Sequence, residues 1–105
     1  MNDEALLALA VDLAVRAGDR IMAIRAAGFE TRTKSDDSPV TAADHEAEAI
    51  IALGLRQALP GAFVVAEEEC AARGAPDAEA ECWLVDPLDG TREFAAGRPE
   101  FTVNI

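Results

Sequence analysis

Cysteine, histidine and tyrosine are almost absent from this sequence of 105 residues, which has two Cys, one His and no Tyr. The two cysteines, Cys70 and Cys82, form no CxxC motif and have no histidine near them in the sequence. Cysteines without such partners are typical of reduced thiols in the cytoplasm, where disulfides are rare. We therefore predict a cytoplasmic protein, and a disulfide between the two cysteines stays open as the alternative.

Basic residues are also few. Nine Lys and Arg stand against 20 Asp and Glu, so the formal net charge at pH 7 is −11. Nucleic-acid backbones and anionic membranes require a positive protein surface, and this composition argues against both as partners. A small phosphorylated substrate is still compatible with the charge, provided that bound metal ions first reverse its local sign.

Long hydrophobic runs are missing as well. None approaches the roughly 20 residues that cross a bilayer, so we expect no membrane span. The first stretch, MNDEALLALA, is acidic, which argues against a signal peptide. Half of the residues are apolar and 28% are charged, as expected for one small globular domain with a core of its own.

Apolar residues recur at helical spacing in two segments. Residues 3–27 fit one amphipathic helix that ends at Gly28. A second helix is expected from Thr41, which can form a capping box with Asp44 three residues later. The apolar positions expected to be buried are Leu6, Leu7, Ala10, Leu13, Ala14, Ala17, Ile21 and Ile24 in the first helix, and Ala47, Ile50, Ile51, Gly54, Leu55 and Ala58 in the second.

Four other segments are predicted strands. They are FETRT (29–33), AFVVA (62–66), CWLVD (82–86) and EFTVNI (100–105), and a polar loop, KSDDSP, follows the first of them. The predicted order is thus helix, ragged hairpin, helix, strand, strand, short helix and strand, which is a mixed α/β fold without an internal repeat. Because the last strand stops at the final residue, we expect the chain to be a piece of a larger domain.

Acidic residues directly follow two of the expected strands. Glu67 comes after AFVVA, and Asp86 and Asp89 lie at the end of CWLVD and just beyond it. Open α/β sheets place ligand sites at the C-terminal ends of their strands, so the three carboxylates converge if the strands are neighbours. Two carboxylates about 4 Å apart repel by about 4 kcal/mol at an effective dielectric of roughly 20, and such a cluster must take up protons or bind a cation. Magnesium, with its preference for oxygen ligands, suits it.

The segment DPLDGT (86–91) adds features of a phosphate site. Pro87 is expected to bend the chain after the strand, so that both carboxylates and the Leu88 carbonyl face one point. Gly90 permits the close approach of an anion, and GTREF would begin a helix whose free N–H groups favour phosphate. Metals beside such N–H groups indicate a metal-assisted phosphatase. The D-x-D-G-T motif of haloacid-dehalogenase phosphatases is one residue shorter, which argues against an aspartate nucleophile and for water.

WLVDPLDGTREF (83–94) resembles the D-P-[IL]-D-G-T signature of the inositol monophosphatase superfamily of magnesium-dependent, lithium-sensitive phosphatases. SPVTAAD (38–44), VVAEEE (64–69) and EFTVNI agree with that family in order and spacing. Within it, DPLDGTREF followed by EFTVNI is most similar to the CysQ-type 3'(2'),5'-bisphosphate nucleotidases. The resemblance implies the N-terminal half of a layered αβαβα sandwich of the inositol monophosphatase/fructose-1,6-bisphosphatase type. Residues 1–105 would be its metal- and phosphate-binding part.

The resemblance also implies a set of metal ligands. Glu67, Asp86, the carbonyl of Leu88 and Asp89 correspond to ligands of two or three Mg2+ ions, and lithium is expected to inhibit. Members of the family supply a further aspartate ligand, in a tryptophan-aspartate motif, from the second half of the fold. This sequence has no counterpart of that aspartate.

Asp44 and Thr91 match a pair that orients and deprotonates the attacking water in the resembled family. The Thr91 hydroxyl would hold the water, Asp44 would hold Thr91, and Glu67 would share the metal that carries the water. The amides of Gly90 and Thr91, beside Asp89, would bind the phosphate. From the residues alone, Asp44 and Thr91 are equally compatible with simple helix capping, and Glu67 with a solvated acidic turn.

The resemblance implies a substrate class too. It favours hydrolysis of the 3'-phosphate of a nucleotide bisphosphate, 3'-phosphoadenosine 5'-phosphate, by metal-activated water. Two alternatives stay open: an inositol or sugar phosphate as substrate, and a metal-binding chain without catalysis.

Overall fold

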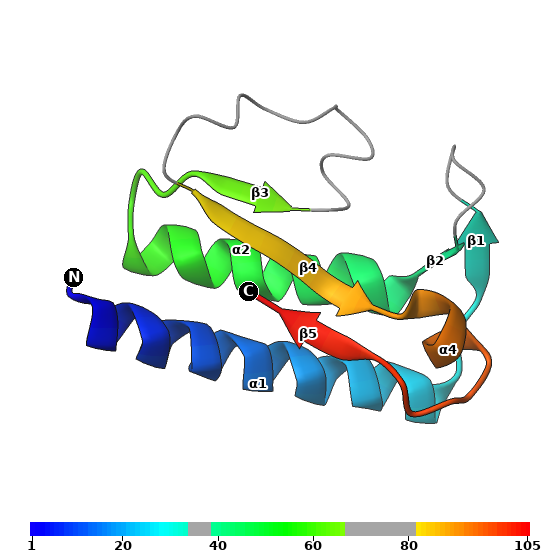
Figure 1. Cartoon of the computed structure of the whole chain (residues 1–105). Coiled ribbons are helices and arrows are strands. Elements are labelled where there is room, and N and C mark those ends of the chain that lie inside the picture. Colours follow the sequence, from blue (N-terminus) through cyan, green and yellow to red (C-terminus); the bar gives the residue numbers. More distant parts are fainter. Residues whose placement is uncertain (34–38, 67–81) are drawn as a thin grey trace.

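Three stretches of the chain, residues 1–33, 39–66 and 82–105, are described by the computed structural model. The first helix, α1 (Asp3–Ala27), precedes an antiparallel pair, β1 (Thr31–Thr33) and β2 (Pro39–Thr41), and then α2 (Ala42–Ala58) (Figure 1). After these come β3 (Val64–Ala66), β4 (Trp83–Asp89), α4 (Thr91–Ala95) and β5 (Thr102–Asn104). Helix, hairpin, helix, two strands, short helix and strand is the order that the sequence predicted.

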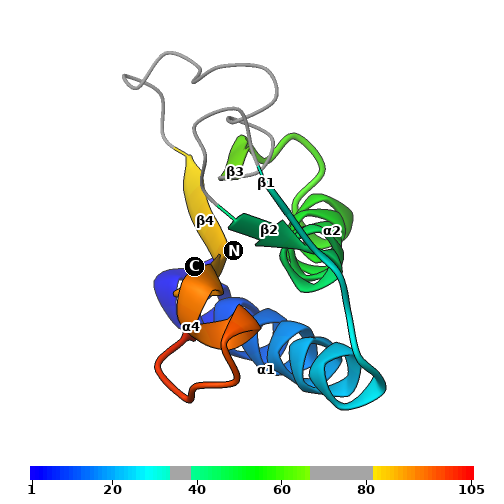
Figure 2. The ribbon, with the colours of Figure 1, turned by 90° about the vertical axis from the view of Figure 1, so that its right-hand side faces the viewer.

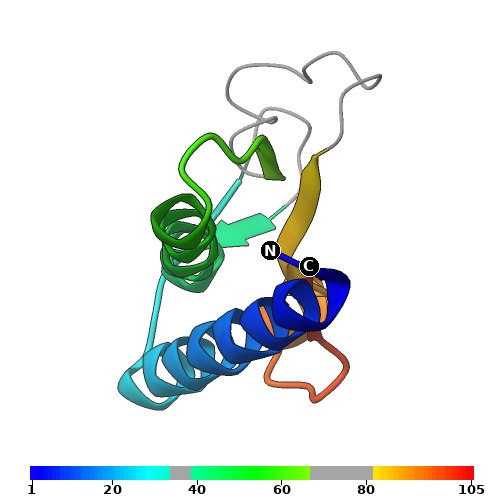
Figure 3. The ribbon, with the colours of Figure 1, turned by 90° about the vertical axis from the view of Figure 1, so that its left-hand side faces the viewer.

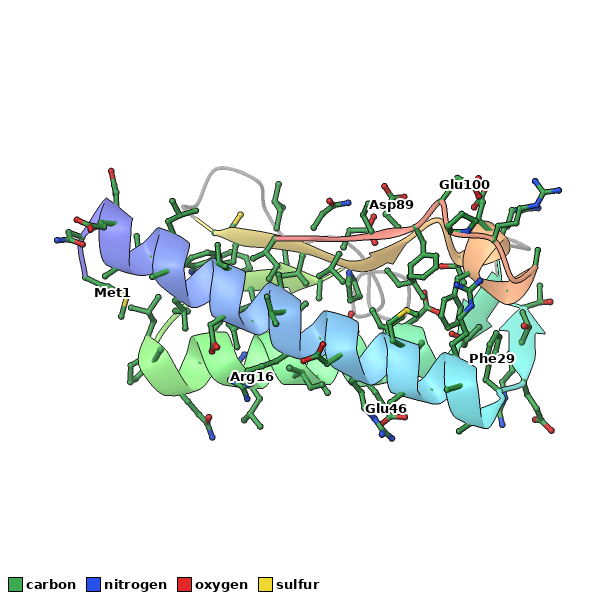
Figure 4. The ribbon with its side chains drawn as sticks, turned by 90° about the horizontal axis from the view of Figure 1, so that it is seen from below. Met1, Arg16, Phe29, Glu46, Asp89 and Glu100 are labelled. Carbon is green, nitrogen blue, oxygen red and sulfur yellow. The ribbon has the colours of Figure 1, made fainter. Side chains whose placement is uncertain are left out.

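A three-stranded sheet of order β3-β4-β5 forms one layer of the molecule. β3 runs parallel to β4, with Ala66 opposite Val85, and β5 runs antiparallel to β4, with Asn104 opposite Asp86. Helices α1 and α2 pack on each other and cover one face of this sheet (Figure 4). Figure 2 shows β1, β2 and α4 together at one end of the molecule, and Figure 3 shows the N-terminus at the opposite end.

Capping groups set the ends of both long helices. The Asn2 side chain accepts a hydrogen bond from the backbone N–H of Ala5 at 2.9 Å and begins α1. Gly28, at φ 92°, ends α1, because a residue with a side chain rarely adopts that conformation. Thr41 caps α2 and shares a capping box with Asp44, as the sequence predicted.

The apolar faces of the helices are narrower than the sequence pattern suggested. Leu13, Ala17 and Ile21 are buried, whereas Leu7 is 66% exposed. Leu7 lies six residues before Leu13, which points it about 120° away from the buried line of α1, so its assignment to the core was wrong. Ala58, the last residue of α2, is also exposed, contrary to its predicted burial.

Pro87 does not bend the chain after the strand, contrary to expectation. β4 continues through Pro87 to Asp89, and its pairing with β5 shifts register between Asp86 and Asp89. A proline has no N–H for the ladder, and an irregularity in the pairing is where a strand tolerates one. The Pro87 ring is fully buried, so this stretch is part of the core.

The core lies between the sheet and the two helices. Phe94 of α4 is fully buried and packs against Phe29 and Phe101, at ring-centroid distances of 4.8 and 5.2 Å. Cys82, just before β4, is a free thiol, and Cys70 lies outside the described residues. Within the part of the chain that the structure describes, no helix combines the length and hydropathy that a bilayer crossing needs.

Candidate functional site

Asp44 is a buried carboxylate at the start of α2, with 1% of its surface exposed. Its Oδ2 accepts hydrogen bonds from the backbone N–H and from the hydroxyl of Thr41, both at 2.8 Å. Burying a carboxylate is costly unless hydrogen bonds replace its water shell, and the capping box supplies two of them. The local sequence therefore fixes the direction in which the other oxygen of Asp44 points.

The second oxygen of Asp44 connects α2 to α4. The Thr91 hydroxyl donates to Asp44 Oδ1 at 2.8 Å, although the two residues are 47 positions apart in the sequence. The same hydroxyl lies 3.2 Å from the carbonyl oxygen of Leu88. Because a hydroxyl has one proton, the shorter contact to a carboxylate is the stronger hydrogen bond. The two residues predicted to act as a pair are thus brought together.

Gly90 connects β4 to α4 and has a left-handed backbone, with φ 91° and ψ 38°. A Cβ atom at this position would lie 2.5 Å from the carbonyl oxygen of Glu100 and 3.2 Å from Cα of Phe101. Both the conformation and the close backbone approach require glycine here. Gly90 was predicted to permit the close approach of an anion. In the structure it also permits the close approach of the backbone that precedes β5.

Asp86 and Asp89 lie on β4, opposite Asn104 and Thr102 of β5. Asp86 is half-buried, and its Oδ1 is shielded from solvent. Asp89 is exposed on the side of the sheet that faces away from the helices, and its Oδ2 accepts a hydrogen bond from Asn104 Nδ2 at 3.4 Å (Figure 4). One carboxylate is therefore held within the fold and the other is open to a ligand.

A hollow of about 470 Å³ adjoins Asp89 and Gly90. Glu93 and Glu100 also line it, so three carboxylate side chains surround this space. An anionic substrate would be repelled from such a hollow unless cations were bound beside it. The charge of the site therefore agrees with the sequence-based expectation that metal ions must precede a phosphate.

Glu67, the remaining predicted metal ligand, lies outside the described residues. The residue before it, Ala66, is the last of β3 and pairs with Val85, the residue before Asp86 within β4. Over residues 1–33, 39–66 and 82–105, no three His, Cys, Asp or Glu side chains gather closely enough to hold a metal ion. The predicted donors that are described, Asp86, the Leu88 carbonyl and Asp89, are all hard oxygen ligands of the kind that Mg2+ prefers.

Two residues near the site were missed by the sequence analysis. Asn104 contacts Asp89, and Arg25 of α1 contacts the carbonyl oxygens of Phe94 and Arg98. The pairing of EFTVNI with DPLD would have revealed Asn104, because the register places it opposite Asp86. No local pattern identifies Arg25, whose partners are 69 and 73 residues away.

Comparison with known proteins gives relatives along nearly the whole chain. The chain is 48% identical to the 3'(2'),5'-bisphosphate nucleotidase CysQ of Salmonella typhimurium, in a match that covers 89% of this chain and 39% of that protein. It is 37% identical to the Nus factor SuhB of Vibrio cholerae, over 95% of this chain and 38% of that protein. The chain thus spans about two fifths of the length of these curated relatives.

The fold is also similar to that of solved structures. The solved structure of the Thermotoga maritima IMPase superposes with a TM-score of 0.79 at 26% identity, covering 94% of this chain and 37% of that one. This likeness confirms the predicted fold class, an α/β sandwich of the inositol monophosphatase type. The sequence profile described as "Inositol monophosphatase family" matches residues 2–105. The chain belongs to the inositol monophosphatase family.

Proposed function

We propose that this chain forms the metal- and phosphate-binding part of a magnesium-dependent phosphomonoesterase. The observation that carries the proposal is the 2.8 Å hydrogen bond from the Thr91 hydroxyl to Asp44 Oδ1. It joins a buried carboxylate to a half-buried hydroxyl beside the carboxylates of β4. Thr41 donates only to Oδ2 of Asp44, so the Thr91 hydroxyl satisfies the second oxygen of this buried carboxylate and, unlike the cap, connects α2 to α4.

The Asp44–Thr91 pair can orient a water molecule and take its proton. Because the Thr91 hydroxyl donates to Asp44, its oxygen lone pairs are left to accept a hydrogen bond from water. A proton that leaves the water for Thr91 Oγ1 can pass on to Asp44 Oδ1 along the existing hydrogen bond. The two hydrogen bonds from Thr41 hold the Asp44 carboxylate in place during this transfer.

Asp86, the Leu88 carbonyl and Asp89 would hold Mg2+, together with Glu67, which the family resemblance adds. The donor set fits in kind, since all four groups are oxygen ligands. Bound Mg2+ would supply the positive charge that polarises a phosphoryl oxygen and makes a nearby water more acidic. The Thr91 proton points to Asp44, which leaves the Leu88 carbonyl oxygen for a metal.

The backbone amides of Gly90 and Thr91 would bind the phosphate, beside Asp89. Thr91 is the first residue of α4, and the first N–H groups of a helix have no partner within the helix. The left-handed conformation of Gly90 sets the direction of these amides. Phosphate would therefore lie next to the Thr91 hydroxyl that orients the water.

We infer that the substrate is 3'-phosphoadenosine 5'-phosphate, which would lose its 3'-phosphate. Support comes from the 48% identity to a protein named as a 3'(2'),5'-bisphosphate nucleotidase and from the DPLDGTREF and EFTVNI segments. The likeness to an inositol monophosphatase structure favours an inositol phosphate as the second candidate. A relative named as a Nus factor keeps a non-catalytic role as the third.

Phosphate release separates these candidates. The 105-residue chain, and any longer gene product that contains it, would be incubated with 3'-phosphoadenosine 5'-phosphate or inositol 1-phosphate at increasing Mg2+. We expect magnesium-dependent release from the nucleotide at least about tenfold above that from inositol 1-phosphate. Equal or reversed rates would contradict the proposed substrate. Mg2+ binding without phosphate release from either compound would contradict the proposal that the protein is a phosphatase.

Asp89→Asn tests the metal site directly. We expect the affinity for Mg2+, measured by calorimetry, to fall about tenfold or more, because a charged ligand becomes a neutral one. Asp12→Asn, an identical change on the exposed surface of α1, serves as the control and should leave the affinity unchanged. Equal affinities in both variants would rule out Asp89 as a ligand.

A further inference from the structure

Arg25, in the last turn of α1, connects that helix to the far end of α4. Its Nη2 donates hydrogen bonds to the carbonyl oxygen of Arg98 at 2.7 Å and to that of Phe94 at 3.2 Å. The Phe94 carbonyl, in the last turn of α4, also accepts the Gly97 N–H at 3.1 Å, and the Arg98 carbonyl lies three residues beyond the end of the helix. A cation at this position also interacts favourably with the helix dipole.

Aromatic rings surround the Arg25 guanidinium. Its central carbon lies 5.2 Å from the centroid of the Phe94 ring and 4.9 Å from that of Phe101, within the range of cation–π attraction. Phe94 in turn stacks on Phe29. The guanidinium is half-buried and uses its N–H groups on backbone carbonyls, so it is a structural contact of α4 and not a ligand for substrate.

The chain that follows α4 carries this contact to Gly90. Arg98 binds Arg25 through its carbonyl, and Phe101 lies against the guanidinium. Glu100 and Phe101 then pass so close to Gly90 that a Cβ atom there would meet the Glu100 carbonyl oxygen at 2.5 Å. The connection from α4 to β5 therefore lies between Arg25 on one side and Gly90 on the other.

A helix of five residues has little stability of its own, so the position of α4 depends on such contacts. Its first residue, Thr91, donates to Asp44 and is the residue whose direction matters most at the site. At its other end, the two hydrogen bonds from Arg25 fix the carbonyls of Phe94 and Arg98. Short α4 is thus fastened at both ends, to α2 by Thr91 and to α1 by Arg25.

We propose that Arg25 is a positioning residue, which holds α4 so that Thr91 meets Asp44 and the amides of Gly90 and Thr91 keep the direction that phosphate requires. The inference rests on the proposed function for the phosphate, and on geometry alone for the position of α4. Lysine cannot replace arginine here, because its compact ammonium group can donate hydrogen bonds but lacks the planar guanidinium that lies against the Phe94 and Phe101 rings while it donates to both carbonyls.

Arg25→Lys is the test, with Arg20→Lys as the matched control. Arg20 lies on the same helix, and its Nε donates at 2.8 Å to Glu46, which belongs to α2 and not to α4. We expect Arg25→Lys to speed amide hydrogen exchange at Phe94, Ala96 and Gly97 by about tenfold, with exchange within α2 unchanged. Arg20→Lys should leave exchange in α4 unchanged. Equal exchange in α4 for both variants would overturn the proposal.

Binding of inorganic phosphate in the presence of Mg2+ gives a second readout. With the Thr91 amide followed by NMR, we expect the dissociation constant of phosphate to rise about fivefold in Arg25→Lys and to stay unchanged in Arg20→Lys. An unchanged constant in Arg25→Lys would overturn the role at the phosphate site. If the unmodified chain binds no phosphate, the proposed function fails, and the exchange experiment still decides whether Arg25 holds α4.

A second variant guards against a misfolded Arg25→Lys. Phe101→Leu removes the ring below the guanidinium but leaves the Arg25 side chain and its two carbonyl partners in place. We expect a smaller increase in exchange at Phe94 and Ala96, about threefold, in a chain whose circular dichroism is unchanged. If neither Phe101→Leu nor Arg25→Lys speeds amide exchange in α4, then Arg25 and the rings around it do not hold α4 in place, and the proposal is wrong.

Discussion

The start of α2 and the end of β4 each carry an aspartate, but the two carboxylates differ in burial and in hydrogen bonding. Asp44 is 1% exposed and accepts three hydrogen bonds of 2.8 Å from Thr41 and Thr91. Asp89 is exposed and, among the residues that the structure describes, accepts one, at 3.4 Å, from Asn104. The Asp44 carboxylate is held by hydrogen bonds within the protein, whereas the Asp89 carboxylate is accessible to a ligand.

This difference fits the two tasks that we propose for these aspartates, proton transfer for Asp44 and metal binding for Asp89. A group that moves a proton must keep a fixed direction, and buried hydrogen bonds provide it. A group that binds a metal ion must keep oxygen lone pairs accessible to the ion, and an exposed carboxylate does so. We therefore expect changes at Asp44 to affect folding as well as chemistry, and changes at Asp89 to affect metal binding while folding is preserved.

The largest effect is expected for Asp44→Ala. The change removes the acceptor of the Thr41 N–H and of the Thr41 hydroxyl, which are buried, and leaves the half-buried Thr91 hydroxyl with only its longer contact to the Leu88 carbonyl. Unsatisfied buried donors are costly, so the free energy of unfolding should fall by about 3 kcal/mol. Urea denaturation followed by circular dichroism measures it.

Asp12→Ala is the control for this prediction. Asp12 forms an exposed ion pair with Arg16 one turn along α1, at 3.5 Å, and its loss should cost at most about 0.5 kcal/mol. Similar losses for the two alanine variants would remove the contrast between buried and exposed aspartates, and with it the argument that Asp44 is positioned by the fold.

A smaller effect is expected for Gly90→Ala. Alanine would be strained at φ 91°, and its Cβ would lie 2.5 Å from the Glu100 carbonyl oxygen, so we expect a loss of about 2 to 3 kcal/mol in unfolding free energy. Gly97 has φ 81° with nothing within 4 Å of an added Cβ, and Gly97→Ala should cost only about 1 kcal/mol. The difference between their thermal unfolding midpoints isolates the contact with Glu100. Equal midpoints would show that β4 and the chain before β5 are not fixed against each other.

The contrast between the two aspartates also explains what the sequence could predict. The capping box of Thr41 and Asp44 is a local pattern and α2 begins where it predicts, while α1 covers the residues 3–27 that the spacing of apolar residues predicted. The carboxylates after CWLVD were equally visible, because they directly follow an apolar run. Contacts set by residues close in sequence, or by the direction in which a strand runs, leave a signal in the sequence itself.

Features that depend on distant partners were not predictable in the same way. The path of β4 through Pro87 depends on its pairing with β5, and the proline, judged from the sequence alone, wrongly suggested a bend. Arg25 reads as an ordinary charged residue at a helix end until α4 is placed beside it. The contact between Thr91 and Asp44 was expected only from the family resemblance, because no periodicity connects two residues 47 positions apart.

The smallest effect, and the sharpest test of the contrast, is expected for Asn104→Ala. Its hydrogen bond to Asp89 is long and exposed, so the free energy of unfolding should change by less than about 0.5 kcal/mol. Its amide nevertheless orients the Asp89 carboxylate, and partners of metal ligands tune affinity, so Mg2+ binding measured by calorimetry should weaken about threefold. A loss of stability as large as that of Asp44→Ala would mean that the end of β4 is held by its own hydrogen bonds after all. Weaker Mg2+ binding with unchanged stability would instead show that the end of β4 serves ligand binding. The start of α2 would then differ from it, because its hydrogen bonds stabilise the fold and orient the proposed proton acceptor, Asp44.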